Sequence, residues 1–342
     1  MKIDPAVLRT LEREREIPFD ELVEILEQAI FAAYVKHATA EAGKDTPPEG
    51  SRVNLDRRTG EVTIVEPQYN DEGEVIGEAL LPAEDFGRIA ASAAKQVITQ
   101  RMRNIDTDKV LGEFRGREGD IVNGVIQQGD DPKMVRIEIA PGVEAIMPPE
   151  EQVPGEDYRH GRRIRVFVTK VERVERVGRG TRSARITVSR THPQLVRKLF
   201  ANEVPEIANG MVDIVAVARE AGHRSKVAVR ATEPGFNAKG ACIGPLGARV
   251  RAVTNELDDE KIDIVDYSNN LSDFVANALS PAKVSSSFVL DPKTKAVRVL
   301  VPDFQLSLAI GKEGQNARLA ARLTGARIDI QPDSVMEDPD ES

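Results

Sequence analysis

The stretch Leu308-Ala309-Ile310-Gly311-Lys312-Glu313-Gly314-Gln315-Asn316-Ala317-Arg318 decides the fold, because it predicts a helix, a two-glycine turn and a second helix. A similar stretch, Gly240-Ala241-Cys242-Ile243-Gly244-Pro245-Leu246-Gly247-Ala248-Arg249, lies upstream. A helical run and then an Ile-Asp-Ile strand, at residues 262–264 and 328–330, follow each Gly-x-x-Gly. The loops begin 67 residues apart (311 − 244) and the strands 66 apart (328 − 262), so the whole unit repeats.

Hydrophobic periodicity predicts the same order of elements in both copies, α-β-β-α-α-β, with the glycine loop between the last two helices. In the first copy we expect a helix at 194–202 and strands at 211–219 and 225–230 ahead of the loop. In the second copy the expected elements are a helix at 270–279, strands at 283–290 and 295–301, helices at 304–310 and 314–324, and a strand at 326–330.

The glycine loop has the chemistry of a site for a phosphate backbone. Two glycines three apart let the chain turn sharply and let a ligand approach bare main chain. The next helix offers free N–H groups and its positive dipole end to anionic oxygen. Lys312 adds a charge at the second loop, and Arg318 adds another one helical turn after Gly314. KH modules are described in this way, and their loop clamps about four nucleotides.

Other phosphate and metal sites are excluded by their patterns. The loop of nucleotide hydrolases needs G-x-x-x-x-G-K-[ST], but Gly311-Lys312 is followed by Glu313, and no G-x-G-x-x-G follows a strand. The single cysteine, Cys242, excludes an intramolecular disulfide framework and a cysteine-cluster metal site, and we interpret it as a core residue. The four histidines are scattered without metal-ligand spacing: His37, His160, His192 and His223. We therefore expect no cofactor, no metal and no catalytic residue.

Length and charge describe a multidomain chain with a basic middle. The 342 residues suffice for two to four domains, and no apolar run approaches the length of a membrane span. Without a signal core at the N-terminus, a cytoplasmic location is expected. The net charge of −9 divides into −9 for residues 1–108, +1 for 109–183, +4 for 184–332 and −5 for 333–342. Between Arg159 and Arg190, eleven Arg or Lys stand against two Glu, which indicates either a polyanion footprint or a solvated sheet edge.

The region before the repeats predicts two further domains. Residues 1–108 form an α+β unit, with two helices within 1–42, strands at 52–55 and 61–66, and a helix at about 88–104. Residues 109–190 predict five short strands, at 120–127, 134–139, 143–147, 162–171 and 184–188. Five strands in so short a segment fit an OB-fold barrel, which binds single strands through a basic groove and stacking aromatics. Of its few aromatics, Phe167 fits a base platform and a core residue equally well.

The order of these parts resembles the NusA family of bacterial transcription factors. The matching stretches include Ala94-Lys95-Gln96-Val97-Ile98, Glu203-Val204-Pro205-Glu206-Ile207, Gly240–Gly244, Lys261–Val265 and Ala309–Ala320. The resemblance implies an N-terminal polymerase-binding domain at 1–108, an OB-fold of the ribosomal S-one type at 109–190 and KH modules of type II at 191–267 and 268–332. A short acidic tail at 333–342 is expected to be disordered.

The resemblance also implies partners and RNA-binding residues. The implied factor is a non-enzymatic monomer that binds RNA polymerase, nascent single-stranded RNA including ribosomal RNA leaders, and other Nus factors, and it modulates pausing, termination and antitermination. The first loop has no basic residue, so its charge must come from Lys239, Arg249 or Arg251. The candidate RNA-binding residues are Lys239, Gly244, Pro245, Leu246, Gly247, Arg249, Arg251, Gly311, Lys312, Glu313, Gly314, Gln315, Asn316, Arg318, Arg163, Arg165 and Phe167.

Two alternatives stay open at this point. An RNA-degrading component can also carry KH and OB modules, but residues 1–108 are short for a nuclease core and lack clustered carboxylates. A ribosome-associated RNA chaperone would have the same RNA-binding parts. A nuclease assay tests the first alternative, and co-purification with ribosomal subunits tests the second.

Overall fold

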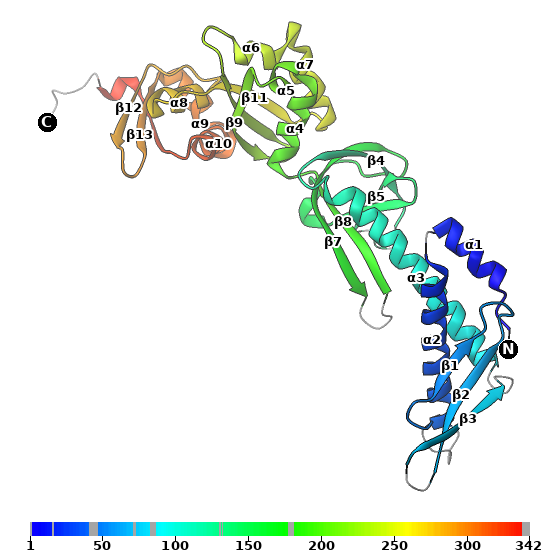
Figure 1. Ribbon diagram of the computed structural model, residues 1–342. Helices are drawn as coiled ribbons and strands as arrows, with labels where there is room; N and C mark the ends of the chain where they lie inside the picture. The colour runs from blue at the N-terminus through cyan, green and yellow to red at the C-terminus, as the bar shows by residue number, and fades with distance from the viewer. Residues whose placement is uncertain are drawn as a thin grey trace. The chain divides into compact units, whose positions relative to one another are not determined.

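The computed structural model describes residues 2–15, 17–40, 47–70, 73–82, 87–129, 131, 133–176 and 181–336. The chain divides into two compact units, one of residues 1–112 and 173–184, the other of residues 113–172 and 185–342 (Figure 1). No helix among the described residues has the length and the apolar character that a membrane crossing requires.

The first unit is an α+β unit, as the sequence predicts. Its elements are α1 (Pro5–Arg15), α2 (Phe19–Ala40), β1 (Arg52–Leu55), β2 (Val62–Tyr69), β3 (Val75–Pro82) and most of α3 (Gly87–Arg115). The strands form an antiparallel sheet in the order β1-β2-β3. Leu22, Leu26 and Ile30 recur at helical spacing on α2 and are fully buried against the sheet and against Ala90 and Ala94 of α3.

Two features of this unit were not expected from the sequence. The sequence pattern does not predict strand β3, because apolar and polar residues do not alternate along it as in a half-buried strand. Two of its apolar residues, Ile76 and Leu80, are both 68% exposed. Helix α3 continues eleven residues beyond the expected end at Asn104 and passes residue 108 without a break. The second half of α3 is polar, so the hydrophobic pattern does not predict the extension. Leu111 and Phe114 near the end of the helix are nevertheless buried.

The second unit begins with the predicted barrel. Its strands are β4 (Ile121–Gln127), β5 (Val135–Ala140), β6 (Val143–Met147), β7 (Arg163–Arg176) and β8 (Thr181–Ser189), closed in the order β4-β5-β6-β8-β7. All pairings between named residues are antiparallel except β6 with β8, which is parallel. The five-stranded closed barrel is OB-like, and alternate residues such as Val122, Ile137 and Val166 fill its interior.

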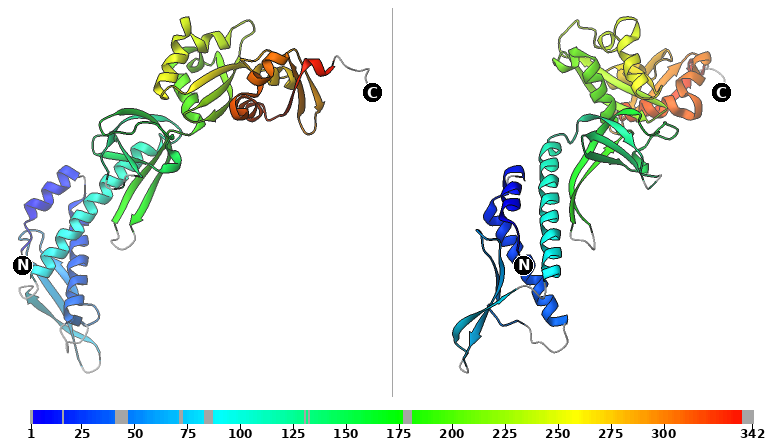
Figure 2. Two further views of the ribbon diagram at one scale, coloured as in Figure 1. Left: turned by 180° about the vertical axis from the view of Figure 1, so that it is seen from behind. Right: turned by 90° about the vertical axis from the view of Figure 1, so that its right-hand side faces the viewer.

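Two modules of the predicted α-β-β-α-α-β order follow the barrel along the chain (Figure 2). The first contains α4 (Pro193–Glu203), a short α5 (Pro205–Ala208), β9 (Val212–Glu220), β10 (Arg224–Ala231), α6 (Ala238–Ile243), α7 (Ala248–Glu256) and β11 (Lys261–Asp266). The second contains α8 (Leu271–Ala278), β12 (Ser286–Asp291), β13 (Ala296–Val301), α9 (Leu306–Ile310), α10 (Gln315–Thr324) and β14 (Arg327–Pro332). In each sheet the middle strand, β10 or β13, has one antiparallel and one parallel neighbour.

Strand β10 is buried on both faces, which joins the two modules. Val227 and Val229 face the core of the first module, whereas Ala228 belongs to a second cluster with Phe274 of α8 and Leu319 of α10. Because side chains alternate along a strand, one face of β10 covers its own helices and the other covers the second module. Lys226, on that second face, is fully buried and donates to the carbonyl oxygen of Ser280 at 2.7 Å.

The first four residues of the segment expected to be a disordered tail form regular structure. Residues 333–336 form a 3-10 turn, and Asp333 accepts a hydrogen bond of 2.7 Å from Ser285 Oγ. Ser334 Oγ lies 2.8 Å from a carboxylate oxygen of Asp303. These two contacts tie the start of the tail to the second module, and residues 337–342 lie outside the described part of the chain.

Candidate nucleic-acid interface

The two glycine loops have the same backbone geometry. Gly244 has φ 72° and ψ 175°, and Gly311 has φ 79° and ψ 168°. Leu246 and Glu313 are both left-handed, with φ 51° and 54°. In both loops the second glycine donates its N–H to the carbonyl oxygen of the first at 3.1 Å. The two loops, which repeat in the sequence, therefore also have matching backbone torsion angles.

The first glycine of each loop is required by its surroundings as well as by its torsion angles. A Cβ at Gly311 would lie 2.8 Å from the backbone nitrogen of Asn316, and a Cβ at Gly244 would lie 2.7 Å from Cγ of Arg249. Asn316 and Arg249 each stand five residues after that glycine. The loop thus folds back closely onto the helix that follows it.

The helices after the loops begin with uncapped N-termini. The N-cap residues are Gly247 and Gly314, which have no side chain to satisfy the first N–H groups of α7 and α10. These N–H groups and the helix dipole favour an anion beside the loop. Lys312 and Arg251 are exposed near the loops, and neither is in an ion pair among the described residues. Both loops can therefore hold phosphate oxygen through main chain plus one free cation.

Two residues expected to contact RNA have side chains that brace the loop, which corrects the expectation for the buried Asn316, while the side chain of Arg249 stays 26% exposed. Asn316 is fully buried, and its Nδ2 donates to the carbonyl oxygens of Leu279 at 2.9 Å and Ala309 at 3.0 Å. Arg249 Nη1 donates to Ala241 O at 2.7 Å and to Glu206 at 2.8 Å. The sequence shows the position of these residues but not the direction of their side chains, which the packing of neighbouring helices decides.

Arg318 and Gln315 are engaged by a carboxylate of the first module. Glu220 Oε1 accepts from Arg318 Nε at 2.6 Å, and Glu220 Oε2 accepts from Gln315 Nε2 at 3.0 Å. Arg318 Nη1 also donates to the carbonyl oxygen of Glu313, within the loop, at 3.1 Å. The Arg318 guanidinium lowers the pKa of Glu220. The cation expected to meet phosphate is therefore partly neutralised in this structure.

The other loop residues are accessible. Leu246 is 95% exposed at the tip of the first loop, with Pro245 beside it, while Glu313 occupies the equivalent exposed tip of the second. Lys239 lies on α6 with Nζ 3.5 Å from Asp266. The first loop thus has an apolar tip, whereas in the second loop Lys312 is followed in the sequence by the acidic Glu313.

In the barrel, the structure decides between the two roles that the sequence allows for Phe167, and two expected residues lie at the boundary with the first module. Phe167 is 6% exposed and stacks on His192 with ring centres 4.4 Å apart, so it is a core residue and no base platform. Arg165 lies 3.6 Å from Glu203 and 3.7 Å from Glu256. Arg163 is exposed and lines a cavity of about 600 Å³ with Asn123 and Glu138. Arg163 keeps the accessibility expected of an RNA contact, whereas Arg165, with a side chain 37% exposed, is engaged by the two carboxylates.

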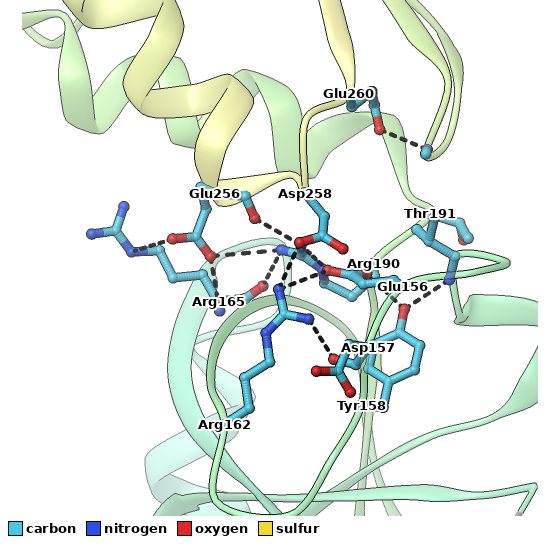
Figure 3. A network of polar contacts seen from close by, with 12 residues as sticks. Glu156, Asp157, Tyr158, Arg162, Arg165, Arg190, Thr191, Glu256, Asp258 and Glu260 are labelled. Carbon is cyan, nitrogen blue, oxygen red and sulfur yellow. Dashed lines mark hydrogen bonds and ion pairs between the residues drawn. The ribbon is translucent and has the colours of Figure 1, made fainter.

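A buried polar network fastens the barrel to the first module (Figure 3). Arg190 is 1% exposed and forms an ion pair with the equally buried Glu156, while its Nη1 and Nη2 donate to the carbonyl oxygens of Arg165 at 2.9 Å and Glu256 at 2.8 Å. Tyr158 Oη donates to Glu156 at 2.7 Å, and burial next to this carboxylate raises the tyrosine pKa. Several of the arginines counted as a basic footprint are therefore structural.

The described residues contain no group of three or more His, Cys, Asp or Glu that could hold a metal ion. Cys242 is fully buried in the core of the first module, and burial raises the pKa of its thiol to about 11. The geometry thus offers anion-binding main chain and scattered cations, which is the chemistry of a polyanion interface.

Comparisons with known proteins agree with this geometry. Residues 190–267 match the NusA-like first KH domain, residues 271–338 the NusA-like second KH domain, and residues 6–70 and 65–108 the NusA N-terminal domain. The chain is similar to proteins named transcription termination/antitermination protein NusA. It is 53% identical to one from Mycobacterium tuberculosis, over 98% of this chain and 94% of that protein. The Bacillus subtilis protein is 42% identical over 96% and 90%, and the Thermus thermophilus protein 36% identical over 98% and 91%.

Proposed function

Because the chain belongs to the NusA family of transcription termination/antitermination proteins, we propose that it binds RNA polymerase and nascent single-stranded RNA and thereby modulates pausing, termination and antitermination. The observation that carries the RNA-binding part is the pair of matching glycine loops, each followed by a helix with an uncapped N-terminus. Such loops bind a sugar–phosphate backbone without reading its sequence, and bases are read beside them.

The proposed division of labour assigns polymerase to residues 1–108 and RNA to the barrel and the two modules that follow. Residues 1–108 have a net charge of −9, which disfavours a polyanion there and suits a basic protein surface. The proposal includes a cytoplasmic, monomeric factor that acts with other Nus factors, including on ribosomal RNA leaders. The proposed activity uses binding alone and needs no catalytic residue.

Transcription in vitro on a template with an intrinsic terminator tests the proposal. Adding the chain to elongating polymerase should change the fraction of terminated transcript and the dwell time at pauses. A variant without residues 1–108 should lose polymerase binding and keep RNA binding, and its circular dichroism shows whether the remaining chain is folded. Full polymerase affinity of a folded truncated variant would refute the division of labour.

Substitution of Lys312 tests the RNA path independently. Lys312→Ala should weaken binding of single-stranded RNA and reduce the magnitude of the salt slope by at most about 0.7, the value for one phosphate contact. Lys293→Ala, in the turn between β12 and β13, is the matched control and should leave the slope unchanged. Equal slopes for all three proteins would place the second loop off the RNA path.

A further inference from the structure

Two exposed phenylalanines in the described part of the chain lie within one residue of corresponding places in the repeat. Among the nine phenylalanines in the described part of the chain, only Phe236 and Phe304 are exposed, at 37% and 82%. Each ends a Pro-x-Phe tripeptide, Pro234-Gly235-Phe236 and Pro302-Asp303-Phe304, directly ahead of the helix that leads to the loop. They precede the first glycine by eight residues (244 − 236) and by seven (311 − 304). A single exposed apolar residue needs no explanation, but an exposed phenylalanine just ahead of both loops indicates a shared role.

Phe304 lies on a face that leads to the second loop. Leu308, four residues later and therefore on the same side of the helical segment, is 44% exposed. Gly311 follows seven residues after Phe304, which corresponds to about 10 Å along a helix. A KH loop clamps about four nucleotides, so a strand held at Gly311 can reach the phenylalanine ring.

Phe236 borders a cavity of about 440 Å³ at the ends of β10 and β11. The cavity is also lined by Arg230 and Tyr267, and the Arg230 guanidinium carbon lies 5.5 Å from the centre of the Tyr267 ring. Ligand cavities for small organic groups have volumes of this order. A flat, polar-edged ring can therefore rest on Phe236 and meet the tyrosine hydroxyl group and Arg230, whose Nη2 also donates to Asp213 at 2.7 Å.

We propose that Phe236 and Phe304 are stacking platforms, each for one base of the single-stranded RNA whose phosphates are held by the loop that follows. The inference rests on the proposed function and adds the aromatic contacts that the barrel, with its buried Phe167, does not supply. Stacking on an aromatic ring tolerates any base, because every base has a π-face. The platforms therefore add affinity without fixing a sequence.

Tryptophan substitution reports the stacking directly, because the chain contains no tryptophan. F236W and F304W, in the full chain, are titrated with a mixed-sequence single-stranded RNA of about 12 nucleotides and with the same RNA carrying abasic sites. RNA should quench both fluorophores, and the abasic RNA should bind with little quenching. The matched control is L290W, since Leu290 is 47% exposed on β12 and lies away from both loops in the sequence. Quenching of L290W to the same degree, or none in F236W and F304W, would overturn the proposal.

Alanine variants separate stacking from electrostatics. Phe236→Ala and Phe304→Ala should each weaken RNA binding about 5- to 100-fold, which corresponds to the usual worth of one stacked base. The salt slope should not change, because no charge is removed, and Leu290→Ala should bind RNA like the unsubstituted chain. Both phenylalanines are exposed, so thermal unfolding should show native-like stability in the two variants.

The outcomes distinguish this inference from the proposed function. If the unsubstituted chain binds no single-stranded RNA, both are overturned. If it binds RNA, and Lys312→Ala weakens binding while both alanine variants bind normally, this inference alone is wrong. If the alanine variants keep their RNA affinity and lose polymerase binding, the rings are protein contacts and the proposal is also wrong.

Discussion

Glu220 of the first module holds Arg318 of the second at 2.6 Å, beside the loop of the second module. The same arginine donates to the carbonyl oxygen of Glu313 in that loop, and Arg322 Nη1 lies 3.8 Å from the same carboxylate oxygen of Glu220. A carboxylate from one module therefore sets how much positive charge the other module presents to RNA.

Glu220→Gln should tighten RNA binding. The change removes a negative charge next to the loop and frees Arg318 for phosphate, so the magnitude of the salt slope should increase by at most about 0.7. Fluorescence titration at several salt concentrations measures both quantities. Asp329→Asn, which removes the partner of Arg298 at 2.8 Å on the second sheet, is the matched control. Weaker binding by Glu220→Gln would mean that the carboxylate positions the loop instead of masking it.

The contact between Glu220 and Arg318 should depend on pH. Hydrogen bonding by Arg318 lowers the pKa of Glu220, so its stabilising contribution is fully present above the ordinary glutamate pKa of about 4.3. The contribution should be lost as the pH falls through the lowered pKa of the folded state. Urea unfolding should therefore show a constant stability difference between the unsubstituted chain and Glu220→Gln from pH 7 to 5, and convergence at lower pH.

The two glycines of the second loop should differ in their tolerance of a side chain. Gly311 has torsion angles that only glycine adopts readily, and an added Cβ would meet the backbone of Asn316. Gly314 is left-handed with open space around it, so alanine there should cost only about 1–2 kcal/mol. Gly311→Ala should therefore destabilise the chain more and abolish RNA binding at this loop. Chemical unfolding and RNA titration measure the two effects, and equal effects would contradict this reading of the backbone.

Arg190 should be the most costly arginine to truncate at the junction of the barrel and the first module. Arg190→Ala removes the close partner of the buried Glu156 and leaves it Tyr158 and the more distant Arg162, whose Nη2 lies 3.8 Å away, so the cost should be at most about 3–5 kcal/mol. Arg159→Ala is the matched control, because the side chain of Arg159 is 79% exposed and its loss should change stability by no more than about 0.5 kcal/mol. Urea unfolding compares the two variants. A small effect of Arg190→Ala would show that the network in Figure 3 is not needed to hold the junction.

Cys242 should be unreactive in the folded chain. Its side chain is fully buried, and a thiol pKa of about 11 leaves almost no thiolate at pH 8. A disulfide reagent should therefore label the folded chain only at the rate of unfolding, and label it at once in concentrated urea. Since Cys242 is the only cysteine, the labelling signal comes from a single site. Rapid labelling without urea would contradict the buried position.

The features of this protein that can be predicted are those that depend on the local pattern of the sequence. The spacing of Gly244, Gly311 and the two Ile-Asp-Ile strands predicts two α-β-β-α-α-β modules, and the structure confirms that order. Alternating apolar residues predict the strands of the barrel, which the structure also shows. The Pro-x-Phe repeat was equally visible, but its meaning depends on exposure, which periodicity does not give.

The sequence by itself determined the modules, the loops and the family, because backbone preferences and periodic burial act over a few residues. Only the tertiary structure decided which side chains remain available to a ligand. Arg318 meets Glu220 across 98 residues of chain, Asn316 turns into a core built by α8, α9 and α10, and Phe167 is covered by His192. Such partners are set by how whole elements pack, so the charge and aromatic surface offered to RNA appear only once the modules have folded against each other.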